Sequence, residues 1–103
     1  MPFARVNVSG IGTTEILAAP GSGNKYQIYG YAIASSGAVA ADFRDGDDTI
    51  RAGAFNLVLG GPIVYAGNSS APAFECGTNQ ALTMNVNAVE SVRGHLVYAV
   101  VGA

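Results

Sequence analysis

The stretch Lys25–Ser36, KYQIYGYAIASS, decides the fold class of this chain. Tyrosine and isoleucine recur in it, and both favour a pleated strand over a helix. Strict two-residue alternation divides it into two faces: Tyr26, Ile28, Gly30, Ala32 and Ala34 on one, and Gln27, Tyr29, Tyr31, Ile33 and Ser35 on the other. Both faces are largely apolar or aromatic, so neither suits water. We predict a central strand with one face in a sandwich core and the other against a second surface, another copy of the chain.

The remaining sequence also reads as strands. Glycine and other turn residues recur at intervals of roughly 8–12 residues, which is typical of a β-sandwich or barrel, and no stretch shows a helical period with start and stop signals. Besides the central strand, the expected strands are Phe3–Val8, Thr13–Ala19, Ala38–Arg44, Thr49–Leu59, Ile63–Ala66, Ala73–Cys76, Ala81–Val89 and His95–Val101. Asp45–Asp48 and Glu90–Gly94 are predicted turns, and Gly53 marks a predicted bulge. Residues 1–9 are expected to form an N-terminal arm or an edge strand.

Composition limits the classes of partner. The 103 residues make a single domain, 1–103, of which 12% is charged, against about 25% in an average soluble domain. The net charge of −2 gives no basic footprint for nucleic acid, and the apolar runs are too short to cross a membrane. We expect no secretion signal. One cysteine, Cys76, excludes an intrachain disulfide and fits a reducing cytoplasm, although a disulfide between chains stays open.

Two predicted strands near the end of the chain differ in their outer faces. Ala81–Val89 alternates cleanly, with Thr83, Asn85 and Asn87 on its polar side, whereas His95–Val101 is apolar on both sides. A sandwich of two unlike sheets follows, one facing water and one covered by neighbouring subunits. The residues predicted to lie in that subunit interface are Tyr29, Tyr31, Ile33, Val97 and Val101.

No constellation of catalytic residues, cofactor ligands or metal ligands is evident. His95 is the only histidine, no Gly-x-Ser-x-Gly elbow frames a serine, and one His with one Cys falls short of a zinc site. Gly21–Lys25 lacks the spacing of a phosphate-binding loop. The acidic run Asp42–Asp48 departs from an EF-hand, so we interpret it as a solvated hairpin, with weak calcium binding at a subunit junction left open.

The five tyrosines allow two interpretations. They could form a platform on which sugars stack, or they could anchor a protein interface, where tyrosine adds a large area with a polar tip. The low charge of the same segments favours the interface. Cys76 is interpreted as a small apolar residue.

Two segments resemble small phage virion proteins and related prophage products. In the first, Ile16–Ser36, a strand ends in Leu-Ala-Ala-Pro, glycines and a basic residue follow, and a long strand runs into a turn. In the second, Gly77–Val101 looks like the closing pair of strands of these proteins, matched at Leu82, Met84, Val86, Val92, Gly94, His95, Val97 and Tyr98. These are signatures of turns and strands, and they specify a fold better than a role.

The resemblance implies an all-β fold, a jelly-roll-like antiparallel β-sandwich of about eight strands that assembles as a homotrimer. Such proteins occur in tailed phages as capsid decoration (cement) proteins and as domains of tails or fibres. Because the chain lacks the long additional segments of fibres, we expect a non-enzymatic decoration protein that binds the major capsid protein lattice and stabilises the head. It would be assembled in the host cytoplasm and located on the virion surface, with no cofactor.

The capsid contact is expected at the N-terminal segment, through Phe3 and Arg5, or at the loop Gly67–Pro72. The alternative function is a receptor- or glycan-binding module of a tail fibre or spike. Exposed aromatic side chains in a pocket near Tyr65 or Phe74 would support that alternative.

Overall fold

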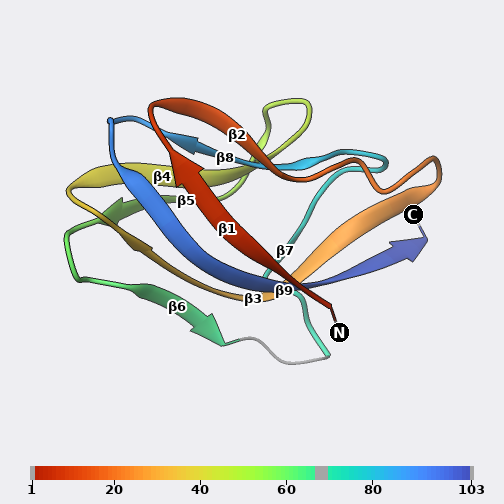
Figure 1. The fold of residues 1–103 in the computed structure, drawn as a ribbon. Coiled ribbons are helices and arrows are strands. Elements are labelled where there is room, and N and C mark those ends of the chain that lie inside the picture. The colour runs from red at the N-terminus through yellow and green to blue at the C-terminus, as the bar shows by residue number, and fades with distance from the viewer. Residues whose placement is uncertain (1, 67–69, 103) are drawn as a thin grey trace.

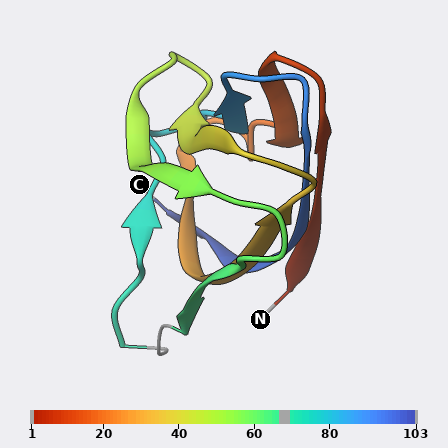
Figure 2. The same cartoon turned by 90° about the vertical axis from the view of Figure 1, so that its left-hand side faces the viewer.

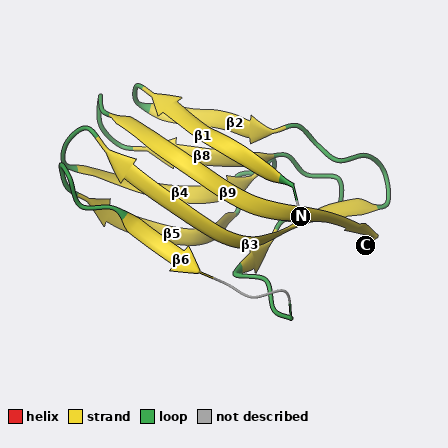
Figure 3. Cartoon of the chain, turned by 60° about the horizontal axis from the view of Figure 1, so that its bottom comes forward, coloured by secondary structure: helices red, strands yellow, loops and turns green. Residues whose placement is uncertain are grey.

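The computed structural model describes residues 2–66 and 70–102. This part of the chain forms nine strands and no helix (Figure 3). The strands are β1 (Phe3–Ser9), β2 (Gly12–Leu17), β3 (Asn24–Ser35), β4 (Val39–Asp45), β5 (Ile50–Leu57), β6 (Ile63–Ala66), β7 (Phe74–Glu75), β8 (Leu82–Val86) and β9 (Ser91–Gly102).

The strands form two antiparallel sheets that pack face to face (Figures 1 and 2). The β3 sheet has the order β1–β9–β3–β6, with β7 also paired to β3, and the β4 sheet has the order β2–β8–β4–β5. The pairs β4–β5, β3–β6, β2–β8 and β1–β9 are nested, as in one long hairpin rolled into a sandwich. The predicted jelly-roll-like fold is confirmed, and the two-residue β7 lies within the predicted strand Ala73–Cys76.

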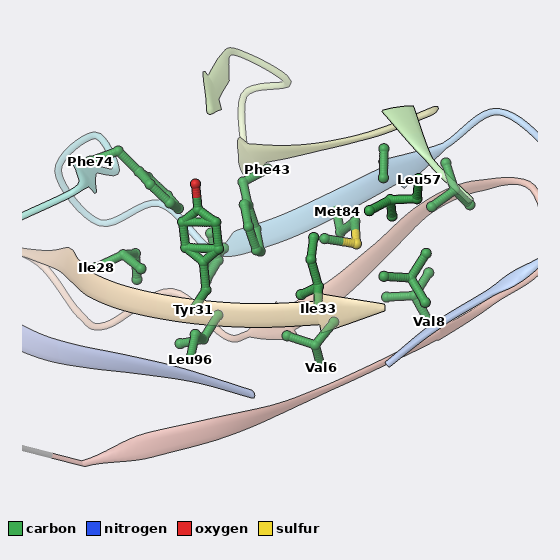
Figure 4. Close-up of a cluster of buried hydrophobic side chains, with 14 of the residues drawn as sticks. Val6, Val8, Ile28, Tyr31, Ile33, Phe43, Leu57, Phe74, Met84 and Leu96 are labelled. Carbon is green, nitrogen blue, oxygen red and sulfur yellow. The ribbon is translucent and has the colours of Figure 1, made fainter. Parts of the chain in front are cut away.

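The core lies between the two sheets and is built from alternate residues of nearly every strand. Figure 4 shows Ile28, Tyr31 and Ile33 of β3 pointing toward Phe43 and Met84 of the other sheet. Phe43, Ile28 and Met84 are fully buried. Strand β8 follows its predicted pattern, with Leu82, Met84 and Val86 inside. Strand β3 is central, as predicted, because β9 flanks one side and β6 and β7 the other.

The predicted division of β3 into two faces is wrong beyond Ile28. Opposite β9, Ile28 pairs with Tyr98 and Gly30 pairs with Val97, so Tyr29 is an extra residue in a β-bulge. One extra residue exchanges the two faces of a strand. Tyr31 and Ile33 therefore lie in the core, 9% and 1% exposed, and are not surface residues of a subunit interface.

A second correction concerns Gly94, which was predicted to end a turn. Strand β9 begins at Ser91, and Gly94 lies within it, opposite Val6 of β1 and Ile33 of β3. Its φ is 157°, and a Cβ at this position would lie 1.8 Å from the carbonyl oxygen of Ala32. Gly94 is thus required by close approach of two backbones in the middle of a sheet.

The hairpin between β4 and β5 forms where it was predicted. Asp48 donates its backbone N–H to the Asp45 carbonyl oxygen, and the positive φ of the turn, 69°, belongs to Asp48 and not to Gly46. The predicted bulge at Gly53 is confirmed, since Gly53 and Ala54 together oppose Asp42. At the N-terminus, β1 is an edge strand paired along its length with β9, so the interpretation as a flexible arm is wrong.

Candidate interaction surface

The outer face of the β4 sheet is polar, as predicted for β8. Asn85 donates from Nδ2 to the Thr13 hydroxyl at 2.9 Å, and the Thr83 hydroxyl donates to the Arg44 carbonyl oxygen at 3.1 Å. Arg44 in turn pairs with Asp42 at 2.7 Å. These polar side chains are hydrogen-bonded to one another across neighbouring strands. Ile50, opposite Arg44 on β5, is an exposed apolar side chain on the same face.

The outer face of the β3 sheet is different. Its register places Arg5, His95, Ala32 and Val64 in one row across four strands, with Phe3, Val97 and Gly30 in the next row. Phe3 is 75% exposed and Val64 is 64% exposed. The β3 residues at the centre of this face, Gly30 and Ala32, have little or no side chain. Large apolar side chains lie at its two edges, on β1 and β6. We call this surface the outer β3 face.

The predicted interface residues divide between this face and the core. Tyr29, Val97 and Val101 lie on the outer β3 face and are half-buried. The Tyr29 hydroxyl donates to Gln27 Oε1 at 2.6 Å, which holds the ring along the strand. Tyr31 and Ile33 are excluded from this face because of the bulge at Tyr29.

The predicted capsid contact falls on the same face. Phe3 and Arg5 line a hollow of about 500 Å³ together with His95 and Val97. Sequence reasoning missed His95 as part of this hollow, because Gly94 was interpreted as a turn and the pairing of β1 with β9 was unknown. The other predicted contact, the loop Gly67–Pro72, includes residues 67–69, which lie outside the described residues.

Most charged side chains elsewhere are paired. Lys25 contacts Glu75 at 2.7 Å, and Gln27 Nε2 also donates to that carboxylate. Both contacts lower the pKa of Glu75, with the hydrogen bond from Lys25 the larger cause. In contrast, neither Arg5 nor Arg93 takes part in an ion pair with any described residue.

Two arginines pair with three of the four aspartates in the acidic run of the β4–β5 hairpin. Arg44 pairs with Asp42 and Asp48, and these hydrogen bonds raise its pKa. Arg51 pairs with the fully buried Asp45 at 2.7 Å, and the same carboxylate oxygen accepts the Gly77 N–H. Within residues 2–66 and 70–102, no three His, Cys, Asp or Glu side chains gather in a group that could hold a metal ion. The structure therefore gives no support to calcium binding at this run.

The two aromatic residues considered for glycan binding, Tyr65 and Phe74, differ in exposure. Phe74 is buried, 5.3 Å from Phe43 between ring centroids. Tyr65 is 44% exposed and stacks on Tyr31 with a centroid separation of 5.8 Å. Both belong to one cluster of five rings, which also contains Tyr31, Phe43 and Phe55. Of Phe74 and Tyr65, only Tyr65 reaches the surface.

Cys76 lies in the core and is 3% exposed. Burial raises the pKa of its thiol to about 12, and the nearby Asp45 carboxylate adds to the shift. A buried, protonated thiol is a poor nucleophile. A disulfide between two folded chains through Cys76 would require the core to open.

We expect iodoacetamide to leave Cys76 unmodified at pH 8 in the folded protein and to alkylate it after denaturation. The unfolded thiol loses its proton near its ordinary pKa of 9.0, below the folded value. Its contribution to stability is therefore present below pH 9 and lost as the pH rises toward 12. Mass spectrometry measures the alkylation, and thermal melting of Cys76→Ala beside the parent isolates the pH effect. Complete labelling of folded protein within minutes at pH 8 would contradict this burial.

Comparison with known proteins finds no protein-family model and no curated protein that matches this chain. No helix among the described residues is long and apolar enough to cross a membrane. The class that the structure itself defines is a jelly-roll-like β-sandwich with one polar and one partly apolar outer face.

Proposed function

We propose that this protein is a non-enzymatic structural protein of a phage virion, a capsid decoration protein that binds the major capsid protein lattice as a homotrimer. The observation that carries the proposal is the outer β3 face, where Phe3 and Val64 are exposed. Large apolar side chains exposed on one face of a sheet support its use as an interaction surface. The resemblance of Ile16–Ser36 and Gly77–Val101 to small virion proteins supplies the biological setting.

In this proposal the two sides of the outer β3 face have different partners. The β1–β9 side, with Phe3 and Arg5, contacts the capsid protein, and the β6 side, with Val64, contacts the neighbouring subunit. A cyclic trimer needs a head-to-tail contact, so the β6 side would meet a different patch of the neighbouring subunit. The protein would be assembled in the host cytoplasm and act on the surface of the head.

The proposed mechanism is binding linkage. A ligand that binds the expanded lattice and not the unexpanded one stabilises the expanded form by its binding free energy, about 4 kcal/mol per site at a thousand times Kd. Because the lattice repeats, many such sites act on one particle. No covalent chemistry is required of the protein.

The test of function is binding to shells of the major capsid protein before and after expansion. The protein is expected to sediment with expanded shells and to delay their disruption by heat. Equal affinity for both forms would remove the mechanism. Binding to glycans on an array, without binding to shells, would favour the receptor-binding alternative and would direct attention to Tyr65.

The trimer is tested separately with Val64→Glu, which places a charge at the exposed edge of the outer β3 face. We expect this variant to be monomeric by light scattering and normally folded by circular dichroism. The matched control is Val89→Glu, because Val89 is 80% exposed in the connection between β8 and β9. If both variants remain trimeric, the subunit contact lies elsewhere.

A further inference from the structure

Three basic or titratable side chains share the β1–β9 side of the outer β3 face. Arg5 lies directly opposite His95 in the antiparallel register, and Arg93 follows the same side of β9 two residues away, opposite Asn7. All three side chains belong to exposed residues. Directly opposed residues in a sheet have Cβ atoms about 5 Å apart, so these groups form one patch.

This patch lacks anionic partners within the described part of the chain. Lys25, Arg44 and Arg51 are each held by a carboxylate, whereas Arg5 and Arg93 form no ion pair there. The protein as a whole carries a net charge of −2. Two guanidinium groups are therefore left without counter-charges on a chain that has more acids than bases. An anionic ligand would supply them.

The neighbouring hollow adds an apolar component. Phe3 and Val97 face each other across β1 and β9 and line it together with Arg5 and His95. Phe3 is 75% exposed, so its ring is available to a ligand. The β1–β9 side thus offers apolar contact and positive charge within two rows of one sheet.

We propose that this hollow is a docking site for an extended peptide segment that carries carboxylate and apolar side chains on one face, at alternate positions. Arg5 and Arg93 would each donate two hydrogen bonds to a carboxylate, and Phe3 and Val97 would bury the apolar side chains of the same face. Exposed ion pairs contribute little individually, so the apolar contact supplies much of the affinity and the charges supply selectivity. Identifying the segment as part of the major capsid protein rests on the proposed function. The apolar lining favours a peptide over a phosphate backbone.

The site is tested by NMR titration of the ¹⁵N-labelled protein with the acetylated, amidated peptide Glu-Ser-Val-Ser-Glu-Ser-Val, which places Glu and Val on one face when extended. We expect the largest shifts at Phe3, Arg5, Arg93, His95 and Val97, and affinity at least tenfold weaker for the same peptide with Gln in place of Glu. The double variant Arg5→Gln/Arg93→Gln should also bind at least tenfold more weakly than the parent. Lys25→Gln, which removes a charge at the other end of the same face, should stay within twofold.

Three results would contradict the docking site. The first is that the NMR chemical shift changes occur outside β1 and β9. The others are equal affinity for the Glu and Gln peptides, and binding of a thymidine hexanucleotide as tight as, or tighter than, that of the Glu peptide. Shell binding separates this inference from the proposed function. If expanded shells bind the parent and the double arginine variant equally, the docking site is wrong and the decoration role stands. If the Glu peptide binds at the hollow but shells do not bind, the decoration role is wrong and the docking site stands.

Discussion

Gly94→Ala is expected to lower the free energy of unfolding by about 3 kcal/mol or more, since it combines a strained backbone with a steric clash. The new Cβ would lie 1.8 Å from the Ala32 carbonyl oxygen, and the atoms it meets are backbone atoms of the adjacent central strand. The sheet cannot relax without separating β9 from β3. For a domain of this size the melting temperature should fall by roughly 12–24 °C.

The matched control is Gly102→Ala in the same strand. A Cβ at Gly102 would meet nothing within 4 Å. This substitution should change the free energy of unfolding by less than about 0.5 kcal/mol. Chemical denaturation followed by circular dichroism measures both variants. Equal stability of Gly94→Ala and the parent would show that β9 and β3 do not approach as closely as described.

Phe43→Ala should cost about 3–5 kcal/mol of stability, the range for truncating a fully buried aromatic side chain. Phe43 is at the centre of the aromatic cluster, with ring centroids 5.2 Å from Tyr31, 5.3 Å from Phe74 and 6.1 Å from Phe55. Its removal leaves a cavity between the two sheets that neighbouring rings fill only in part. Urea denaturation measures the loss.

Phe3→Ala is the same chemical change at a site that is 75% exposed. It should leave the free energy of unfolding nearly unchanged, since little apolar area is lost from the core. A loss from Phe3→Ala as large as that from Phe43→Ala would mean that β1 packs more deeply than its edge position indicates. The pair therefore separates core packing from surface exposure.

Much of the fold follows from local sequence pattern. The alternation in Leu82–Val86 predicts which side chains enter the core, and the turn residues at Asp45–Asp48 predict the hairpin. These features depend on neighbours in sequence, so the chain displays them directly. The assignment of the β3 face failed because the bulge at Tyr29 is set by pairing with β9. Its one local sign is the adjacent Gly30, the same signal that correctly indicated the bulge at Gly53.

The prediction that Gly94 ends a turn was wrong for a related reason. A glycine after Arg93 has the same sequence appearance whether it ends a turn or lets two backbones approach, and only the position of Ala32 decides between them. Part of the candidate surface was predicted from the sequence, namely Phe3, Arg5 and Val97. His95 and Arg93 were not predicted to lie on it, because only the register between β1 and β9 places them beside Arg5.

The position of β9 has a consequence for biosynthesis. It is the last strand of the domain in chain order, yet it lies between β1 and β3 and supplies the pairing edge for both. A nascent chain that has not reached residues 91–102 therefore leaves β1 without its hydrogen-bonding neighbour. Open edges of this kind recruit other strands. A fragment that stops before residue 91 would therefore be prone to aggregation.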